Sequence, residues 1–359
     1  MAKPSEFGDQ LIRWHETIDR ELPWKKDQDP YKIWLSEIIM QQTRVAQGTP
    51  YYLKFVSEYP TIIDLADASE EDVMKLWQGL GYYSRARNLH HAAKTVKNEF
   101  AGEFPTDYKD ILSLKGVGKY TAAAIASFAY GQEYAVVDGN VIRVLSRYYG
   151  MTDAVDQSAT LNSIQEKANQ LLNGSDPADF NQAIMDFGAL HCTPKLPNCD
   201  ACIFADTCIA FQNDLVSIIP TKAKKIKKRN RYLHYLIIKD RAGKLIIHHR
   251  TKKDIWKSLY DYFCIELSSE VQVDERTIKE KVNDLFGLEI NSIVYPTKIY
   301  KHILSHQTLY GQFYKVSVDE LTQVEHPYRK VDQDKIHSYA LPVLITNYLN
   351  DAKEDKLFA

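Results

Sequence analysis

The chain has 359 residues, which is long enough for two domains that each bury a core of their own. Its hydrophobic content of 45% and charged content of 26% are those of a soluble globular protein. No apolar run follows a basic head at the start, and no stretch approaches the roughly 18 apolar residues that a membrane span needs. We therefore expect a cytoplasmic protein that has no membrane partner.

The net charge of −2 neither supports nor excludes a nucleic-acid partner, because cations are needed only where phosphates lie. Residues 1–212 hold 20 Lys and Arg against 28 Asp and Glu, and the remainder holds 25 against 19. Two basic runs, 77–97 and 221–231, contain no acidic residue. A solvated charged surface explains either run as well as a phosphate contact does.

Residues 5–212 carry apolar side chains at three- and four-residue spacings, which predicts almost continuous helix. Helix-start signals recur at Ser69, Ser84 and Asp138, and Gly and Pro residues separate the helical stretches. The pattern predicts an all-α domain over residues 1–212.

The pattern changes after residue 213. We expect a basic linker at 213–230 and then an α+β domain over 231–359. Two apolar runs flanking a Gly-containing turn predict a β-hairpin at 231–251. The further predicted elements are a strand at 261–267, a helix at 276–287, strands near 293–304 and 309–318, and a short helix near 340–350.

Four of the five cysteines cluster with the spacing C-x6-C-x2-C-x5-C, at Cys192, Cys199, Cys202 and Cys208. In a cytoplasmic protein this favours a metal site over disulfides. Four thiolates can each bind one iron of a cubane cluster. Zinc is the alternative, although zinc sites usually use two C-x2-C pairs. The lone Cys264 is interpreted as a small buried hydrophobe.

Two further features point to chemistry on DNA. Gly116 and Gly118 precede a helix of small residues, so their backbone amides and the helix N-terminus can hold a phosphate. A plain tight turn is the alternative. Asp138 stands before the next predicted helix, where a simple N-cap is the alternative to a catalytic role.

Glu37 lies inside a strongly apolar predicted helix, so we expect it to be at least partly buried. Burial raises a carboxyl pKa, which suits a general acid; the alternative is a surface Glu beside Lys32 or Arg44. Cleaving an N-glycosidic bond needs one group that protonates the leaving base and a carboxylate that stabilises the cationic sugar. Glu37 and Asp138 match these two groups. The target base must also leave the duplex, because its reacting atoms are inaccessible inside the stack.

The motifs LPWKKDQDPYKIWLSEIIMQQTRV, WQGLGYYSRARNLH, LKGVGKYTAAAIASF and VVDGNVIRVLSR occur in this order and are followed by the cysteine spacing. Over residues 13–208 the sequence therefore resembles the A/G-specific adenine glycosylases (the MutY family) of the endonuclease III superfamily. The resemblance implies an all-α helix-hairpin-helix glycosylase domain with a 4Fe–4S cluster on the four cysteines.

The resemblance also implies roles for individual residues. Glu37 would protonate adenine at N7, Asp138 would stabilise the cationic sugar or form a covalent adduct with it, and Tyr120 and Asn140 would support them. The implied adenine-pocket positions are Arg20, Trp24 and Gln182. The implied DNA contacts are Gln42, Thr43, Leu80, Tyr82, Gly116 and Gly118.

One position separates the chain from bifunctional relatives. These carry a Schiff-base lysine at the second residue after Gly-x-Gly, where this chain has Tyr120. Lys119 is one residue earlier, about 100° round a helix. We expect monofunctional hydrolysis that leaves an abasic site.

The C-terminal part resembles the family's Nudix-like domain, which inspects the opposite 8-oxoguanine. The G-x5-E-x7-R-E-x2-E-E motif of nucleotide pyrophosphatases is absent from the sequence, so that activity is not expected. The resemblance implies lesion recognition by Leu304, Ser305 and His306, with Leu304 in place of the family's aromatic residue. A plain strand over 305–314 is the alternative. Ser258 and Phe263 replace a glycine and a proline of the family pattern.

The expected protein is a monomeric, nucleoid-associated enzyme of base excision repair that removes adenine opposite 8-oxoguanine or guanine. One alternative keeps the enzyme class but acts on thymine or uracil mismatches or on oxidised pyrimidines. Protonation at N7 by Glu37 argues against it, because that is purine chemistry. The other alternative is a catalytically silent mismatch-binding protein, which the presence of both carboxylates disfavours.

Overall fold

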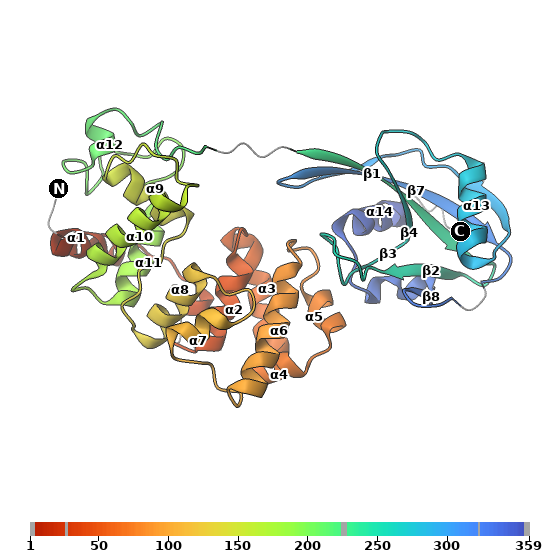
Figure 1. Cartoon of the computed structure of the whole chain (residues 1–359), viewed down its shortest axis with the longest axis horizontal. Helices are drawn as coiled ribbons and strands as arrows, with labels where there is room; N and C mark the ends of the chain where they lie inside the picture. The colour runs from red at the N-terminus through yellow and green to blue at the C-terminus, as the bar shows by residue number, and fades with distance from the viewer. Residues whose placement is uncertain (1–3, 26–27, 224–227, 322–323, 355–359) are drawn as a thin grey trace. The chain divides into compact units, whose positions relative to one another are not determined.

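The computed structural model describes residues 4–25, 28–223, 228–321 and 324–354 (Figure 1). The chain divides into two compact units, one made of residues 1–67 and 88–225 and the other of residues 68–87 and 226–359. Residues 224–227 of the expected linker lie outside the described residues. Among the described residues, no helix is long and apolar enough to span a membrane.

The first unit is helical, as the sequence predicts (Figure 1). Several of its helices begin where an aspartate accepts backbone N–H groups of the first turn, as Asp29, Asp107 and Asp176 do. Its elements are α1 (Pro4–Glu16), η1 (Pro23–Lys25), α2 (Pro30–Met40), α3 (Val45–Glu58), α4 (Ile62–Asp67), α7 (Tyr108–Ser113), α8 (Lys119–Tyr130), α9 (Gly139–Tyr148), α10 (Ser158–Leu172), α11 (Pro177–Leu190) and α12 (Ile209–Gln212); α6 (Ser84–Glu99) starts in the second unit and continues into the first.

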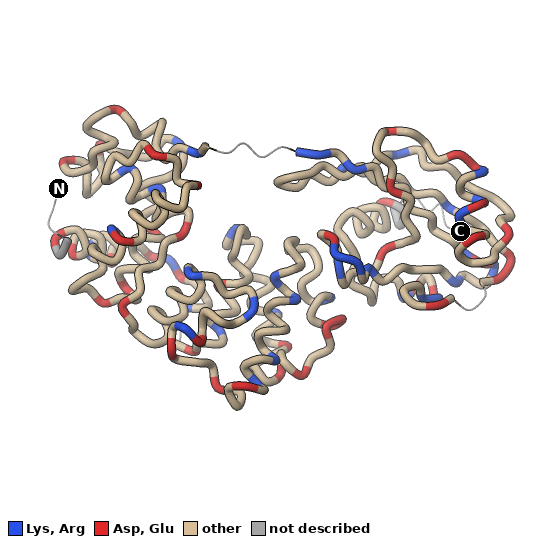
Figure 2. Tube along the Cα trace, in the orientation of Figure 1, with Lys and Arg blue, Asp and Glu red and all other residues tan. Residues whose placement is uncertain are grey.

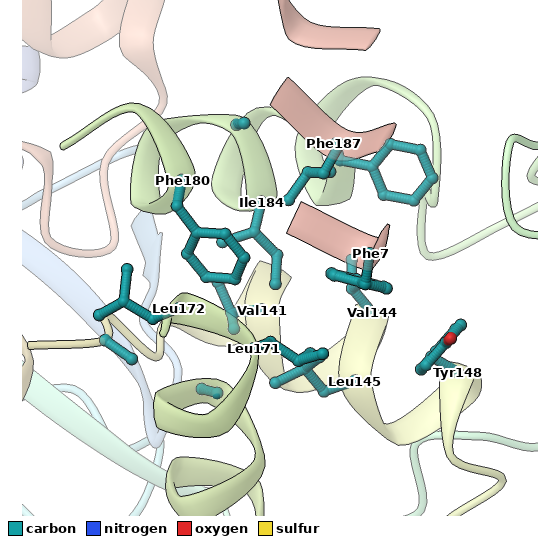
Figure 3. Close-up of a cluster of buried hydrophobic side chains, with 14 of the residues drawn as sticks. Phe7, Val141, Val144, Leu145, Tyr148, Leu171, Leu172, Phe180, Ile184 and Phe187 are labelled. Atoms are coloured by element: carbon teal, nitrogen blue, oxygen red, sulfur yellow. The ribbon is translucent and has the colours of Figure 1, made fainter. Parts of the chain in front are cut away.

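Helices α1, α9, α10 and α11 enclose a hydrophobic core (Figure 3). Phe7 of α1 stacks on Phe204 of the cysteine loop with ring centroids 4.3 Å apart. Cys192, Cys202 and Cys208 pack against the same core. The cysteine loop is therefore anchored on the helices that also carry Asp138 and Gln182.

The long apolar run at 31–59, predicted as nearly continuous helix, is interrupted between α2 and α3. Gln42 has a φ of 54°, in the left-handed region, where a right-handed helix cannot continue. The interruption places Gln42 and Thr43 in a turn directly after the helix that carries Glu37.

The second unit is built on an eight-stranded sheet whose central path runs β3-β2-β1-β7-β5. The predicted hairpin is confirmed, since β1 pairs antiparallel with β2, whereas β1 and β7 are parallel neighbours. Strand β8 was not predicted. The strands are β1 (Arg229–Lys239), β2 (Lys244–His249), β3 (Tyr260–Asp261), β4 (Phe263–Leu267), β5 (Ile290–Val294), β6 (Tyr300–Ile303), β7 (Gln307–Val318) and β8 (Tyr328–Asp332); the helices are α5 (Glu70–Leu76), α13 (Glu275–Phe286), η2 (Gln333–Ser338) and α14 (Val343–Glu354).

Helix α14 lies against the sheet at a glycine. A Cβ on Gly311 of β7 would come within 2.8 Å of the Leu344 side chain, so the glycine permits this close approach. Phe313 and Tyr348 stack beside it with centroids 4.0 Å apart. On the opposite side, α13 buries Ile278 and Val282 in a second apolar cluster.

Acidic and basic residues are interspersed along both units, and basic residues mark the start of β1 (Figure 2).

Candidate active site

Glu37, Tyr120 and Asp138 form one interacting group of ionisable side chains, although they come from α2, α8 and the N-cap of α9. The pKa of Glu37 is raised to about 7, mainly by burial; a hydrogen bond from Tyr120 opposes the shift, and the nearby charge of Asp138 adds to it. Glu37 is partly buried, as expected, and is not the exposed surface residue of the alternative interpretation. A carboxyl with this pKa is protonated in a large fraction of molecules near neutral pH.

Asp138 is the N-cap of α9 and also lies close enough to Glu37 to affect its pKa. Its carboxylate accepts the backbone N–H groups of Asn140 and Val141, each at 2.8 Å, and the Asn140 side-chain amide at 2.7 Å. Burial raises the pKa of Asp138 above its usual value, and these hydrogen bonds and Arg143 oppose that shift. The three donors all stabilise the ionised carboxylate.

Tyr120 lies in the first turn of α8, directly after the Gly-x-Gly turn. Its hydroxyl hydrogen-bonds Glu37 and also donates to Sδ of Met185 at 3.9 Å. Lys119 precedes Tyr120 at the start of α8, whose N-cap Gly118 provides no side-chain cap.

The turn before α8 needs its first glycine. Gly116 has a φ of 84°, and a Cβ there would lie 2.7 Å from the Cβ of Asn88. With α7 on one side and α8 on the other, residues 114–118 form the hairpin of a helix-hairpin-helix motif. The amides of this turn and the N-terminus of α8 can hold an anion such as a phosphate.

Helix α9 connects Asp138 to the cysteine loop through a residue that sequence reasoning missed. Arg143 donates to Oδ1 of Asn140 at 2.9 Å and to the carbonyl oxygen of Cys192 at 2.8 Å. It also donates to the carbonyl of Gly188 at 2.5 Å. Asn140 and Arg143 are three residues apart and share a helix face, which is the signal that could have identified this pair.

Gly188 is a second missed residue. A Cβ at this position of α11 would lie 2.7 Å from Cβ of Asn140 and 3.0 Å from its backbone. Only a glycine lets α11 approach α9 this closely at the residue that holds Asp138.

The four predicted cysteines line one pocket, so the structure brings this group together. Burial raises the pKa values of Cys199, Cys202 and Cys208, that of Cys202 to about 11. Neighbouring thiols contribute to these shifts. A cationic group between the four sulfurs would reverse this, because it favours thiolates. Among the described residues, no three or more His, Cys, Asp or Glu side chains are grouped to hold a single metal ion.

Arg147 holds the cysteine loop from α9. Its buried guanidinium donates to the carbonyls of Thr193 at 2.7 Å and Ile219 at 3.0 Å, and to Sγ of Cys192 at 3.4 Å. Donation to a cysteine sulfur and a permanent positive charge both stabilise a thiolate.

Two of the predicted adenine-pocket residues, Trp24 and Arg20, contact residues outside the predicted pocket. Trp24 packs edge-on against Tyr52 with centroids 5.5 Å apart. Arg20 forms an ion pair with Asp186 of α11, the helix that also carries Gln182. Of the predicted DNA contacts, Thr43 donates from Oγ1 to the backbone carbonyl of Gln41 at 3.3 Å. Gln41, which was not predicted as a DNA contact, donates from its side-chain amide to Thr121.

In the second unit, residues 68–87 lie with the C-terminal residues. One pocket of this unit is lined by the predicted DNA contacts Leu80 and Tyr82 and by all three residues of the predicted lesion loop, at positions 304–306. The hydroxyls of Tyr82 and Ser305 are 3.4 Å apart.

Ser258 has a φ of 68°, so the family's glycine is replaced where the backbone is left-handed. Cys264, predicted to be a small buried hydrophobe, is partly buried, and burial raises the pKa of its thiol.

Comparison with known proteins matches both units. A model of the HhH-GPD superfamily base excision DNA repair proteins matches residues 35–170, and a NUDIX domain model matches residues 234–351. The chain is 37% identical to the adenine DNA glycosylase of Buchnera aphidicola subsp. Schizaphis graminum over 85% of each chain. It is 43% identical to the human adenine DNA glycosylase over 59% of this chain and 40% of that protein.

Two solved structures resemble the helical part. A thermostable thymine-DNA glycosylase is 31% identical with a TM-score of 0.53, over 58% of this chain and 97% of that one. Endonuclease III in a non-covalent DNA complex is 20% identical with a TM-score of 0.52, over 60% of this chain and 99% of that one, and shares the fold.

Proposed function

The chain belongs to the adenine DNA glycosylase family, and from this membership we propose that it hydrolyses the N-glycosidic bond of adenine mispaired with 8-oxoguanine or guanine. The observation that carries the proposal is the pairing of Glu37, whose pKa is about 7, with Asp138 beside it. These carboxyls have different surroundings, which is how one enzyme keeps an acid and an ionised carboxylate together.

In the proposed reaction, the adenine is first flipped out of the duplex, because its reacting atoms are inaccessible within the stack. Protonated Glu37 then donates its proton to N7 of the base, which turns adenine into a neutral leaving group. Tyr120 holds the Glu37 carboxylate through its hydroxyl and fixes its direction. This step needs an acid that is protonated at neutral pH, which burial provides.

Departure of the base leaves an oxocarbenium-like sugar. Ionised Asp138 stabilises this cation electrostatically or adds to the anomeric carbon, and water completes the hydrolysis. Hydrogen bonds from Asn140 and from the N-terminus of α9 stabilise the ionised form of Asp138 and fix the orientation of its carboxylate oxygens. Tyr120 stands where lyase relatives have their lysine, so the product is an abasic site without strand cleavage.

We propose that the four cysteines bind a 4Fe–4S cluster. The donor set fits, since four partly buried thiols line one pocket beside Arg147. When bound, the cluster holds the loop in shape rather than supplying a redox step, because hydrolysis needs none. The chain's own contribution is the arginine contacts that fix this loop on α9.

For lesion recognition we propose the pocket of the second unit that Tyr82, Ser305 and His306 line. Variants Ser305→Ala and His306→Ala should reduce the preference for adenine opposite 8-oxoguanine over adenine opposite guanine. Equal losses on both duplexes would refute this role.

A thymine substrate is the competing proposal, because a thymine-DNA glycosylase is among the similar structures. That similarity covers 58% of this chain. The test is to incubate the protein with duplexes that carry adenine opposite 8-oxoguanine, adenine opposite guanine, or thymine opposite guanine, and then cleave abasic sites with alkali. We expect cleavage of the adenine strands. Cleavage of the thymine strand alone would refute the proposal.

The lyase question has its own assay. Borohydride added during turnover reduces a Schiff base to a stable protein–DNA adduct, and we expect no strong adduct. A strong adduct would identify a lyase and overturn the assignment of simple hydrolysis.

A further inference from the structure

Asp186 on α11 is a buried carboxylate that the reaction described above does not use. Its side chain is 1% exposed, yet it accepts from three basic side chains. His15 Nε2 is 3.0 Å away, Lys25 Nζ is 3.2 Å away, and Arg20 completes the set. Three basic groups around one carboxylate is more than charge neutralisation requires.

All three partners belong to one short segment of the chain. Residues 15–25 run from the end of α1 through an irregular stretch at 17–22 to η1. Because irregular backbone lacks the hydrogen-bond ladder of a helix or strand, such a segment depends on side-chain anchors for a fixed position. Leu22 is buried, Trp24 packs on Tyr52, and Asp186 binds the segment at its beginning, middle and end.

Asp186 also lies next to the catalytic group. Its neighbour Met185 accepts a hydrogen bond from the Tyr120 hydroxyl, and Gln182 lies one turn earlier on the same helix. Positions 182, 185 and 186 share a face of α11, because residues three and four apart lie together. Asp186 therefore joins the segment that carries Arg20 and Trp24 to the helix that carries Gln182.

Burial alone would raise the pKa of Asp186. The hydrogen bond from His15 and the charges of Lys25 and Arg20 outweigh it and hold the pKa at about 2. Asp186 is consequently ionised throughout the pH range in which the protein would be assayed. Its oxygens are occupied by these cations, so its action on the substrate is indirect.

We propose that Asp186 is a positioning residue, which fixes residues 15–25 on α11 so that Arg20 and Trp24 stand against the base-binding side of the active site. The inference rests on the proposed function, since Arg20, Trp24 and Gln182 receive the flipped base in that proposal. A displacement of about 1 Å in a substrate-positioning group can reduce a rate by ~10²-fold.

The test is a double-mutant cycle with Asp186→Asn and Arg20→Met, using excision of adenine opposite 8-oxoguanine. We expect each single variant to lose roughly ten-fold or more in kcat/KM, mainly through KM. The double variant should lose less than the product of the two single losses, because both substitutions disrupt the Arg20–Asp186 ion pair. Multiplying losses, or a loss in kcat alone, would overturn the proposal.

Two further variants separate positioning from folding. Asp186→Glu keeps the charge and should recover part of the activity lost in Asp186→Asn. Ile184→Val removes one methyl group from the core on the same helix (Figure 3) without touching the ion pairs. We expect it to retain wild-type KM; an equal rise in KM would show that helix stability alone explains the effect.

Base capture can be measured without chemistry. In a Glu37→Gln background, a duplex with 2-aminopurine at the adenine position should fluoresce more strongly when the base is unstacked. Adding Asp186→Asn should reduce this increase, and an unchanged signal would contradict the proposal. If wild-type protein releases no adenine, the proposed function fails; if wild type is active and Asp186→Asn equals it, only this inference fails.

Discussion

Asn140 donates two hydrogen bonds to Asp138, one from its backbone N–H at 2.8 Å and one from its side-chain amide at 2.7 Å. The same side chain accepts from Arg143, which also donates to the carbonyl of Cys192. Asp138 is thus held by a helix terminus and by a side chain whose own position depends on the cysteine loop.

The first prediction concerns this side chain. Asn140→Ala removes one donor from Asp138 and leaves an Arg143 donor without its acceptor. Because a hydrogen bond to a charged group contributes about 1.5–3 kcal/mol, we expect single-turnover excision to fall by roughly 10–100-fold. Asn140→Asp, which places a like charge beside Asp138, should be slower still. Unchanged rates in both variants would rule out a role for Asn140.

The second prediction is the pH dependence set by Glu37. The acid acts in its protonated form, so the single-turnover rate should decline as pH rises through about 7. At low pH the rate should decline again when Asp138 becomes protonated, at a pH above the usual range of an aspartate. A rate that stays flat from neutral to alkaline pH would contradict the assignment of Glu37 as general acid.

The third prediction links the same pKa to stability. A carboxyl whose pKa is about 7 in the folded state and 4.5 otherwise stabilises the fold below pH 4.5, and this contribution is lost as pH rises through 7. Glu37→Gln cannot ionise, so at pH 8 it should be more stable than wild type by up to ~3 kcal/mol. Unfolding by denaturant measures the difference, which should disappear near pH 4. A less stable variant at pH 8 would contradict it.

The fourth prediction concerns Gly188. Gly188→Ala places a methyl group against Asn140, so α11 and α9 must move apart, with a cost of about 1–3 kcal/mol. The excision rate should fall by more than the loss of folded protein accounts for, because the shift displaces Asn140, which donates to Asp138. Gly8→Ala is the matched control, since its new methyl meets the movable hydroxyl of Ser175. Equal activity in both variants would disprove the prediction.

The fifth prediction concerns the cysteine loop. Arg147→Met removes buried donors to three carbonyls, those of Thr193, Pro194 and Ile219, and to one thiol, so we expect a loss of about 3 kcal/mol in stability and a lower iron content per protein. Lys167→Met, which removes a cation above the ring of Tyr149, is the control that leaves the loop untouched. Stoichiometric zinc in a colourless wild-type protein would refute the cluster assignment.

Much of the fold follows from local pattern. Helical spacing and capping residues such as Asp138 predicted the helical part, and the Gly-containing turn predicted the β1–β2 hairpin. The sequence did not reveal the parallel pairing of β1 with β7 or the existence of β8, because strand partners distant in sequence leave no local signal.

The sequence indicates candidate site residues where a side chain differs in character from its surroundings. Glu37 is a carboxylate in an apolar helix, and Asp186 in IMDFGAL carries the same signal. The role of Asp186 is not visible in the sequence, because its partners lie more than 160 residues away. Gly188 could not be predicted, since its importance depends on the distance between two helices.

The most direct test of adenine hydrolysis is to identify the released base and the remaining sugar by mass spectrometry, from a duplex with adenine opposite 8-oxoguanine under single-turnover conditions. We predict free adenine and an intact strand with one abasic site from the wild-type protein, and neither product from Glu37→Gln, which should still bind the duplex. Adenine release that persists in Glu37→Gln, or release of a pyrimidine instead of adenine from mismatched DNA, would contradict the account.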